Sequence, residues 1–224
     1  GIRDLIVTGV QTCALPICVF GFISFQTNAE NTLTFTIAAP DSPPFIYKNE
    51  DTNLQGIWFE LFKLLKDETG ITVDVQIMPW ARALQEVKFG RIDALMPAMY
   101  TEERSQYLVY PEKSLIDFYD NVLLKRVEDD FQFSGVSNIP QDKVIAKVRL
   151  MSLGDEFDTA FAKGALKFVD VLNTDTAILM LNQGRIDLML SDYHLAVSAL
   201  KRNGIENNIR MLKVSDKVLS SYIA

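Results

Sequence analysis

Two stretches of the sequence, Gly90-Arg-Ile-Asp-Ala-Leu-Met96 and Gly184-Arg-Ile-Asp-Leu-Met-Leu190, decide the fold class. Each begins with a glycine, which ends a helix easily because it adopts a left-handed backbone without a Cβ clash. Each continues, after an aspartate, into an apolar run typical of a buried strand. Helix–glycine–strand joints are common, so the four shared residues alone can arise by chance. Because the flanks also match, we interpret the stretches as equivalent joints in two lobes of similar β/α construction.

The residues around both joints predict alternating strands and helices. We expect strands at 33–38, 72–78, 92–96, 168–171 and 188–190, and helices at 57–69, 80–89 and 175–183. Such alternation predicts an α/β fold with two lobes, each a mostly parallel sheet flanked by helices. Ligands bind open α/β sheets at the carboxyl ends of the strands. We therefore expect a site between the lobes, built from the loops at 40–45, 78–80, 97–104 and 191–194.

Charge and composition argue against several classes of function. The chain of 224 residues has a net charge of −7, and its basic residues are scattered along the sequence. Because a phosphate backbone is bound by concentrated Lys and Arg, we expect no nucleic-acid partner. The single histidine, His194, argues against a histidine-based metal site, and the only cysteines, Cys13 and Cys18, lie near the N-terminus. We therefore expect neither a metal nor a cofactor.

The first 29 residues are expected to lie outside the folded protein. A short apolar run at 18–25 precedes small side chains at Thr27 and Ala29, the pattern that signal peptidase accepts. The run is too short to span a bilayer, so we expect export to the periplasm with cleavage after Ala29; a buried first strand is the alternative. Residues 7–17 look like a translated sequencing adapter, which would have replaced the start of the signal.

Seven segments of the chain, taken in order, resemble the bacterial extracellular solute-binding protein family 3. The resemblance runs from about residue 33 onward and implies a two-lobe, type II periplasmic binding protein fold that closes about a hinge. The segments are Pro43-Pro-Phe-Ile-Tyr47, Gln55-Gly-Ile-Trp-Phe-Glu-Leu61, Met78-Pro-Trp80, Gly90-Arg-Ile-Asp93, Thr101-Glu-Glu-Arg104, Gly154-Asp-Glu-Phe157 and Gly184-Arg-Ile-Asp187, with Asp192 following.

The resemblance also implies how the chain divides between the lobes. Lobe one is expected at 30–120, lobe two at 121–208 and a return to lobe one at 209–224. The two crossovers are expected near 119–125 and 207–213. Members of the family continue with further helices that return to lobe one, so we expect this return to be truncated.

Arg104 is the first candidate for contact with a ligand. In the resembled family the arginine of the Thr-x-x-Arg motif holds the ligand's carboxylate, and a guanidinium fork donates parallel bonds that a lysine cannot reproduce. The alternative is a surface arginine paired with Glu102 or Glu103. Thr101, which begins the motif, is counted among the ligand contacts.

Four further residues complete the predicted site. Asp192 matches the lobe-two aspartate that receives the ligand's ammonium group in the family, and it can also cap the helix expected from Tyr193. Ser152 aligns with a lobe-two hydroxyl donor of the family. Trp80 and Phe45 offer aromatic surface, either to the cleft wall or to the core of lobe one.

The stretch Met96-Pro-Ala-Met-Tyr100 departs from the family pattern, which places small hydroxyl residues before the Thr-x-x-Arg motif. Pro97 has no N–H to donate, and Met99 has no hydroxyl group. Two ligand hydrogen bonds are therefore missing. The solute need not be a standard α-amino acid.

The resemblance implies a monomeric periplasmic protein that binds a small polar, carboxylate-bearing solute and delivers it to the membrane permease of an ABC importer. A sensory domain of a receptor is an alternative from another class. A periplasmic dehydratase-type enzyme is a third, and it needs an acid or base in the cleft, for which Glu60 and Glu102 are the candidates in type. We expect no enzymatic activity, because both glutamates fall at positions that the family pattern explains as structural.

Overall fold

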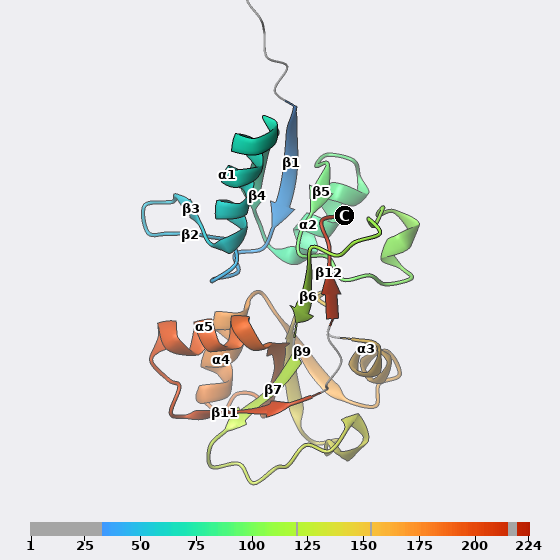
Figure 1. Ribbon diagram of the computed structural model, residues 1–224. Coiled ribbons are helices and arrows are strands. Elements are labelled where there is room, and N and C mark those ends of the chain that lie inside the picture. The colour runs from blue at the N-terminus through green and yellow to red at the C-terminus, as the bar shows by residue number, and fades with distance from the viewer. Residues whose placement is uncertain (1–32, 120, 153, 215–218) are drawn as a thin grey trace, which may run out of the picture. The chain divides into compact units, whose positions relative to one another are not determined.

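A computed structural model describes residues 33–119, 121–152, 154–214 and 219–224 (Figure 1). The predicted leader at 1–29 and its adapter-like segment at 7–17 lie outside the described residues. The helices are α1 (Ile57–Thr69), α2 (Trp80–Lys88), α3 (Asp155–Ala162), α4 (Thr174–Asn182) and α5 (Tyr193–Asn203), with 3-10 turns at Arg104–Gln106 and Val136–Asn138. The strands are β1 (Thr34–Ala39), β2 (Tyr47–Lys48), β3 (Leu54–Gln55), β4 (Thr72–Ile77), β5 (Ala94–Leu95), β6 (Ile116–Tyr119), β7 (Asn121–Arg126), β8 (Val144–Val148), β9 (Lys167–Val171), β10 (Leu188–Asp192), β11 (Ile209–Lys213) and β12 (Leu219–Ser221).

Lobe one, which we define as described residues 33–119 and 219–224, is built on a parallel sheet of order β4-β1-β5. Successive residues of a strand point to opposite faces of the sheet. Ile37 accordingly packs with Trp58 and Phe62 of α1. Its neighbour Ala38 packs instead with residues of α2. The two helices therefore bury opposite faces of β1.

Lobe two, which we define as described residues 121–214, is built on a five-stranded sheet of order β11-β7-β10-β8-β9. Val122 and Leu124 pack with α4 and α5, whereas Leu123 packs with Phe157 and Phe161 of α3. Figure 1 shows the same arrangement, with α4 and α5 on one side of the sheet and α3 on the other. A sheet buried on both faces explains the apolar runs of its inner strands, Val122-Leu-Leu124 in β7 and Leu188-Met-Leu190 in β10.

The predicted α/β, two-lobe fold class is confirmed, with a difference in the second sheet. Strands β8, β9 and β10 pair in parallel, but β7 runs antiparallel to both β10 and β11. The sheet of lobe two is therefore mixed.

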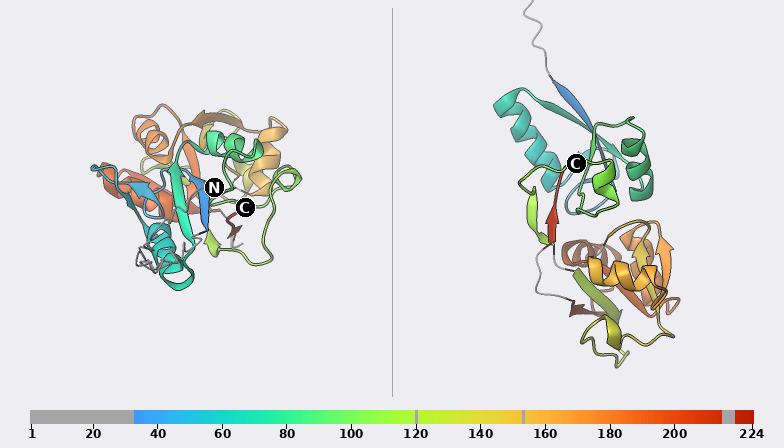
Figure 2. Two further views of the ribbon diagram at one scale, coloured as in Figure 1. Left: turned by 90° about the horizontal axis from the view of Figure 1, so that it is seen from above. Right: turned by 90° about the vertical axis from the view of Figure 1, so that its right-hand side faces the viewer.

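The segments that connect the two lobes cover fewer residues than the sequence predicts. β6 pairs antiparallel with β12, and Figures 1 and 2 show the two strands side by side. The crossover expected across 119–125 contains most of β7, which lies wholly in lobe two. The return expected from residue 209 begins later, because β11 supplies hydrogen bonds to the edge of β7. The predicted crossover at 207–213 is therefore wrong, because β11 belongs to the sheet of lobe two. The return to lobe one comes after β11.

The two Gly-Arg-Ile-Asp joints have the same structure. Gly90 and Gly184 have φ angles of 65° and 70°, in the left-handed region that favours glycine. The Asp93 carboxylate accepts a hydrogen bond from the backbone N–H of Thr36 at 2.8 Å. The Asp187 carboxylate accepts from the N–H of Val144, also at 2.8 Å. Each aspartate therefore fixes the beginning of the strand beside its own, which accounts for its place in the repeated motif.

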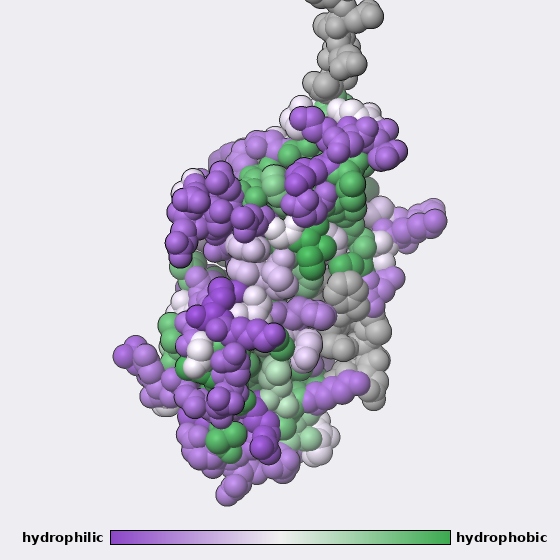
Figure 3. All heavy atoms as spheres, turned by 60° about the vertical axis from the view of Figure 1, so that its left-hand side comes forward, coloured by the Kyte–Doolittle hydropathy of each residue, from purple (hydrophilic) through white to green (hydrophobic). Residues whose placement is uncertain are grey.

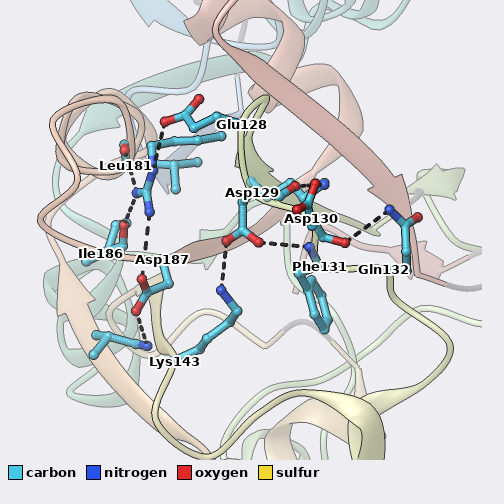
Figure 4. A network of polar contacts seen from close by, with 12 residues as sticks. Glu128, Asp129, Asp130, Phe131, Gln132, Lys143, Leu181, Ile186 and Asp187 are labelled. Atoms are coloured by element: carbon cyan, nitrogen blue, oxygen red, sulfur yellow. Dashed lines mark hydrogen bonds and ion pairs between the residues drawn. The ribbon is translucent and has the colours of Figure 1, made fainter.

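The second joint has an additional support from Arg126, at the end of β7. Figure 4 shows its partners Glu128, Leu181, Ile186 and Asp187. The Nη1 atom of Arg126 donates to the carbonyl of Leu181, near the end of α4, at 3.1 Å and to that of Ile186 at 2.6 Å. Its Nη2 lies 3.7 Å from Oδ1 of Asp187, and its Nε lies 3.4 Å from Oε1 of Glu128. A cation beside a helix C-terminus satisfies carbonyls that have no partner within the helix.

The face shown in Figure 3 is mainly hydrophilic, with apolar residues between the polar ones in both halves of the molecule. Among the described residues, no helix has the length and apolar composition of a membrane span.

Replacing either joint aspartate with alanine is expected to destabilise the fold. Asp93→Ala leaves the N–H of Thr36 without its acceptor and should lower the free energy of unfolding by about 1–2 kcal/mol. Asp187→Ala should cost more, because it also removes the ion pair with Arg126. Urea denaturation measures both, with Asp74→Ala, at an exposed position of β4, as the control. If Asp93→Ala and Asp187→Ala are as stable as the control, the two aspartates do not stabilise the fold.

The Asp129–Lys143 pair is expected to make stability depend on acid pH. Burial acts to raise the pKa of Asp129, but hydrogen bonds from Lys143 and from the N–H of Phe131 outweigh it and hold the pKa below its ordinary value. A carboxyl group with a lowered pKa stabilises the fold above its unfolded pKa of about 3.9, and this contribution is lost as the pH falls through the folded pKa. Asp129→Asn should therefore lower the unfolding free energy by about 1–2 kcal/mol at pH 7. At about pH 3 the difference from the original protein should shrink; a difference that stays constant would contradict the assignment.

Candidate ligand-binding site

A small cavity of about 30 Å³ is lined by residues of both lobes. It collects residues from all four loops that the sequence places at the carboxyl ends of strands. Of the six predicted ligand contacts, Arg104, Asp192, Trp80, Ser152 and Phe45 line it, and Thr101 does not. The remaining lining residues are Pro40, Ser42, Pro97, Met99, Met151, Leu195 and Ser221.

Phe45 is positioned by the beginning of α1. The N–H groups of Ile57 and Trp58 donate to the carbonyls of Pro44 and Phe45 at 3.2 and 2.9 Å. Gly56 permits this approach, because its φ is 114° and a Cβ there would lie 2.3 Å from the Phe45 carbonyl oxygen. The Phe45 ring stacks on Trp58 with centroids 6.0 Å apart. Phe45 thus belongs both to the core of lobe one and to the cavity wall.

Arg104 is buried, with 6% of its surface exposed. Its Nη1 donates to the carbonyl of Met99 at 3.0 Å and its Nη2 to that of Leu150 at 2.8 Å. Burial lowers the pKa of the Arg104 guanidinium from its ordinary value. The ordinary pKa of arginine is so high that the group remains protonated at physiological pH despite this lowering. The alternative of a surface arginine paired with Glu102 or Glu103 is therefore wrong.

The Leu150 carbonyl, in lobe two, accepts two hydrogen bonds from lobe one. Besides Arg104, the indole Nε1 of Trp80 donates to it at 3.0 Å. The guanidinium of Arg104 also lies over the Trp80 ring, 5.4 Å from the centroid. Leu150 has a φ of 59°, which is unusual for a residue with a branched side chain and orients this carbonyl. Trp80, predicted as either core or cleft wall, is a core residue that also faces the cavity.

Thr101 positions Arg104 from outside the cavity. Its Oγ1 accepts a hydrogen bond from the Arg104 N–H at 3.2 Å, at the beginning of the 3-10 turn Arg104–Gln106. The Thr-x-x-Arg motif therefore has a local structural role. Direct contact between Thr101 and a ligand stays a prediction.

On the lobe-two side, Asp192 ends β10 and caps α5. Its Oδ1 accepts from the N–H groups of His194 and Leu195 at 2.9 and 3.1 Å, so the capping role foreseen from the sequence is present. The cap fixes the orientation of the carboxyl group at the cavity. Ser152 donates its hydroxyl to Asp158 at 2.5 Å, so it contacts a ligand either as an acceptor or after giving up that bond.

The wall formed by residues 97–99 carries few hydrogen-bond donors. Pro97 has no N–H, and the N–H of Ala98 donates to the carbonyl of Tyr222 at 2.8 Å. The carbonyl of Met99 accepts from Arg104 and, at 3.1 Å, from the hydroxyl of Tyr110. Burial raises the pKa of Tyr110, which keeps that hydroxyl protonated as a donor.

The cavity is large enough for about two water molecules. A solute of amino-acid size therefore requires its walls to separate. A larger hollow of about 910 Å³ shares Arg104, Met151 and Ser152 with the cavity and provides the adjoining space. Its lining is rich in carboxylates: Glu102, Glu103, Asp155 and Asp158.

Of the two glutamates that could serve as an acid or a base, Glu102 lines the adjoining hollow and Glu60 does not. Glu60 pairs with Lys63 at 2.6 Å on the exposed side of α1, and Glu102 accepts from the hydroxyl of Tyr100 at 3.3 Å. Neither glutamate lines the cavity. Within the described residues, no group of three or more His, Cys, Asp or Glu side chains is arranged to hold a metal ion.

The sequence analysis does not include Met151, Leu195 and Ser221 among the site residues, and it includes Ser42 only as part of the loop 40–45. Ser42 and Met151 each stand close in sequence to a predicted contact, Phe45 and Ser152, so the loops themselves were a usable signal. Leu195 follows Asp192 by one helical turn. Ser221 reaches the cavity only because β12 pairs with β6, and no local pattern announces that pairing.

The two buried tryptophans provide a test of the Leu150 contact. Trp58 and Trp80 are each 3% exposed, but Trp58 Nε1 has no hydrogen-bond partner among the described residues. Trp80→Phe should lower the unfolding free energy by about 1 kcal/mol more than Trp58→Phe, because only Trp80 loses a hydrogen bond. Chemical denaturation of the ligand-free variants gives both values. If both variants lose the same unfolding free energy, the Trp80–Leu150 hydrogen bond does not contribute to stability.

Residues 35–131 match the family model of bacterial extracellular solute-binding proteins, family 3. No curated protein sequence matches this chain. Solved structures share its fold at low sequence identity. An ancestral arginine-binding protein bound to arginine is 17% identical, with a TM-score of 0.70 over 85% of this chain and 84% of that one.

Two other solved structures are similar over most of their length. A histidine kinase sensor domain with similarity to periplasmic binding proteins is 17% identical, with a TM-score of 0.73 over 86% of this chain and 81% of that one. A Streptococcus pneumoniae substrate-binding protein of an ABC uptake transporter, with bound histidine, is 17% identical, with a TM-score of 0.68 over 85% and 78%. The resemblance drawn from the sequence is thereby confirmed: residues 35–131 carry the pattern of bacterial extracellular solute-binding proteins of family 3, on the two-lobe fold of periplasmic binding proteins.

Proposed function

We propose that this protein binds a small zwitterionic, amino-acid-like solute between its lobes in the periplasm, and delivers it to the permease of an ABC importer. One observation carries the proposal. Arg104 of lobe one and Asp192 of lobe two, of opposite charge, line the same cavity. A molecule with a carboxylate at one end and an ammonium group at the other complements both.

The carboxylate end is assigned to Arg104. In the structure the guanidinium donates to two neutral carbonyls, those of Met99 and Leu150. A carboxylate offers charge-assisted hydrogen bonds, which are roughly twice as strong as bonds to a neutral acceptor. A solute carboxylate that replaces the Leu150 carbonyl, or adds to it, therefore gains binding energy at this position.

Binding is coupled to hinge closure. β6 and β12 pair at the crossover, and each lobe has its own sheet. Leu195 of lobe two packs into the lobe-one cluster, so the lobes can move as units at the cost of that contact. A solute that contacts Arg104 and Asp192 together binds the closed arrangement better than the open one. That differential affinity drives the shift toward closure.

The comparisons support this class of solute. Proteins of the same fold are described as bound to arginine and to histidine, and one of them belongs to an ABC uptake transporter. The matched family is extracellular, which agrees with export to the periplasm.

A sensory role is the second candidate, and one observation favours it. The histidine kinase sensor domain has this fold, with a TM-score of 0.73. A sensor and a transport protein differ in the partner that recognises the closed form, and both use the same grip on the solute.

Arg104→Lys should weaken binding by about 1.5–3 kcal/mol, the worth of a hydrogen bond to a charged group, because lysine loses the planar fork. Isothermal titration calorimetry with L-arginine, L-histidine and L-glutamine measures the affinities. Agmatine, which is arginine without its carboxylate, should bind far more weakly than L-arginine.

Arg82→Lys is the matched control, because Arg82 is exposed on α2 and pairs with Glu86 outside the cavity. It should leave the affinity unchanged. If agmatine binds as tightly as L-arginine, or if Arg104→Lys equals the control, the carboxylate grip is misplaced. If no amino acid binds the original protein, the proposed solute class is wrong.

A further inference from the structure

Ser221 is a buried serine that lines the candidate cavity. It is completely buried, at 0% exposure. Its Oγ has no hydrogen-bond partner among the described residues. A buried hydroxyl without a partner is destabilising, so such groups are rare in native proteins unless they serve a ligand or an ordered water.

The backbone around Ser221 places this hydroxyl on the Arg104 side of the cavity. Its carbonyl accepts from the N–H of Leu115 at 2.7 Å, and its neighbour Tyr222 exchanges two hydrogen bonds with Ala98. Ser221 therefore lies beside the wall formed by residues 97–99. Arg104 contacts the same wall through the carbonyl of Met99.

The two serines of β12 have different partners. Successive side chains of a strand point to opposite faces. Ser220 hydrogen-bonds the side chain of Asp117, and together with Ser114 it lowers the pKa of that carboxyl group. Ser221 faces the other way, toward the cavity. The hydroxyl of Ser220 is thus bound within the protein, whereas that of the adjacent Ser221 has no partner among the described residues.

We propose that the Ser221 hydroxyl donates a hydrogen bond to the carboxylate of the bound solute, on the same side as Arg104. The inference rests on the proposed function and adds a residue to its carboxylate end. The wall at 97–99 offers no hydroxyl, and its Ala98 N–H is already engaged with Tyr222. Ser221 supplies, from a neighbouring strand, the donor that this wall lacks.

Ser221→Ala and Ser220→Ala form a matched pair for the test. Each is titrated with L-arginine, L-histidine and L-glutamine by calorimetry, and the ligand-free proteins are melted. Ser221→Ala should weaken binding of the tightest of these probes by roughly tenfold, because one hydrogen bond to a charged group is lost. Its ligand-free melting temperature should stay equal to that of the original protein or rise, because the variant removes an unsatisfied buried group.

Ser220→Ala should show the reverse: unchanged affinity and a melting temperature no higher than that of the original protein. If Ser221→Ala binds as tightly as the original protein, or melts earlier in the ligand-free state, the hydroxyl is structural and the inference is overturned, while the proposed function stands. If none of the three probes binds the original protein, the proposed function itself fails. The two failures are therefore distinguishable.

Discussion

The burial of the Arg104 guanidinium is the constraint on which the candidate site depends. A buried cation requires acceptors, and here these are the carbonyls of Met99 and Leu150, one from each lobe. The Leu150 carbonyl is shared with Trp80, and its position requires a left-handed backbone at a leucine. The charge in lobe one is thus bound by a carbonyl of lobe two whose residue has a left-handed backbone. The same charge makes the cavity suitable for an anion, so the stability of this region and its recognition chemistry share one group.

Local sequence patterns predict the elements of the fold well and its long-range pairing poorly. The helix expected at 57–69 is α1 with the same bounds, because its apolar stripe and the glycine after it are both local signals. The equivalence of the two Gly-Arg-Ile-Asp joints was also visible, since each aspartate acts on a neighbouring strand in the same way. β11 was read as a crossover because its partner, β7, lies more than eighty residues earlier.

The residues of the candidate site also divide into those that local motifs predict and those that depend on long-range pairing. Charged and aromatic residues in recognisable motifs, such as Arg104 and Asp192, could be named from the sequence, and the structure brings them to one cavity. The carbonyl acceptors of Arg104 could not, because every residue has a carbonyl and only the backbone path selects Leu150. Ser221 was missed for a related reason: a serine in a short strand carries no signal until its pairing is known. The small volume of the cavity is a property of how the lobes are packed, which composition does not encode.

Part of lobe one is formed by residues that are synthesised after the whole of lobe two. Leu95 exchanges hydrogen bonds with Ala224, and Ala98 exchanges them with Tyr222. Because the chain emerges N-terminus first, β1, β4 and β5 are present long before these partners. Their edge stays open to water or to other strands during that interval, which is a risk for misassembly. The edge of the lobe-one sheet therefore depends on strand partners that lie at the other end of the chain.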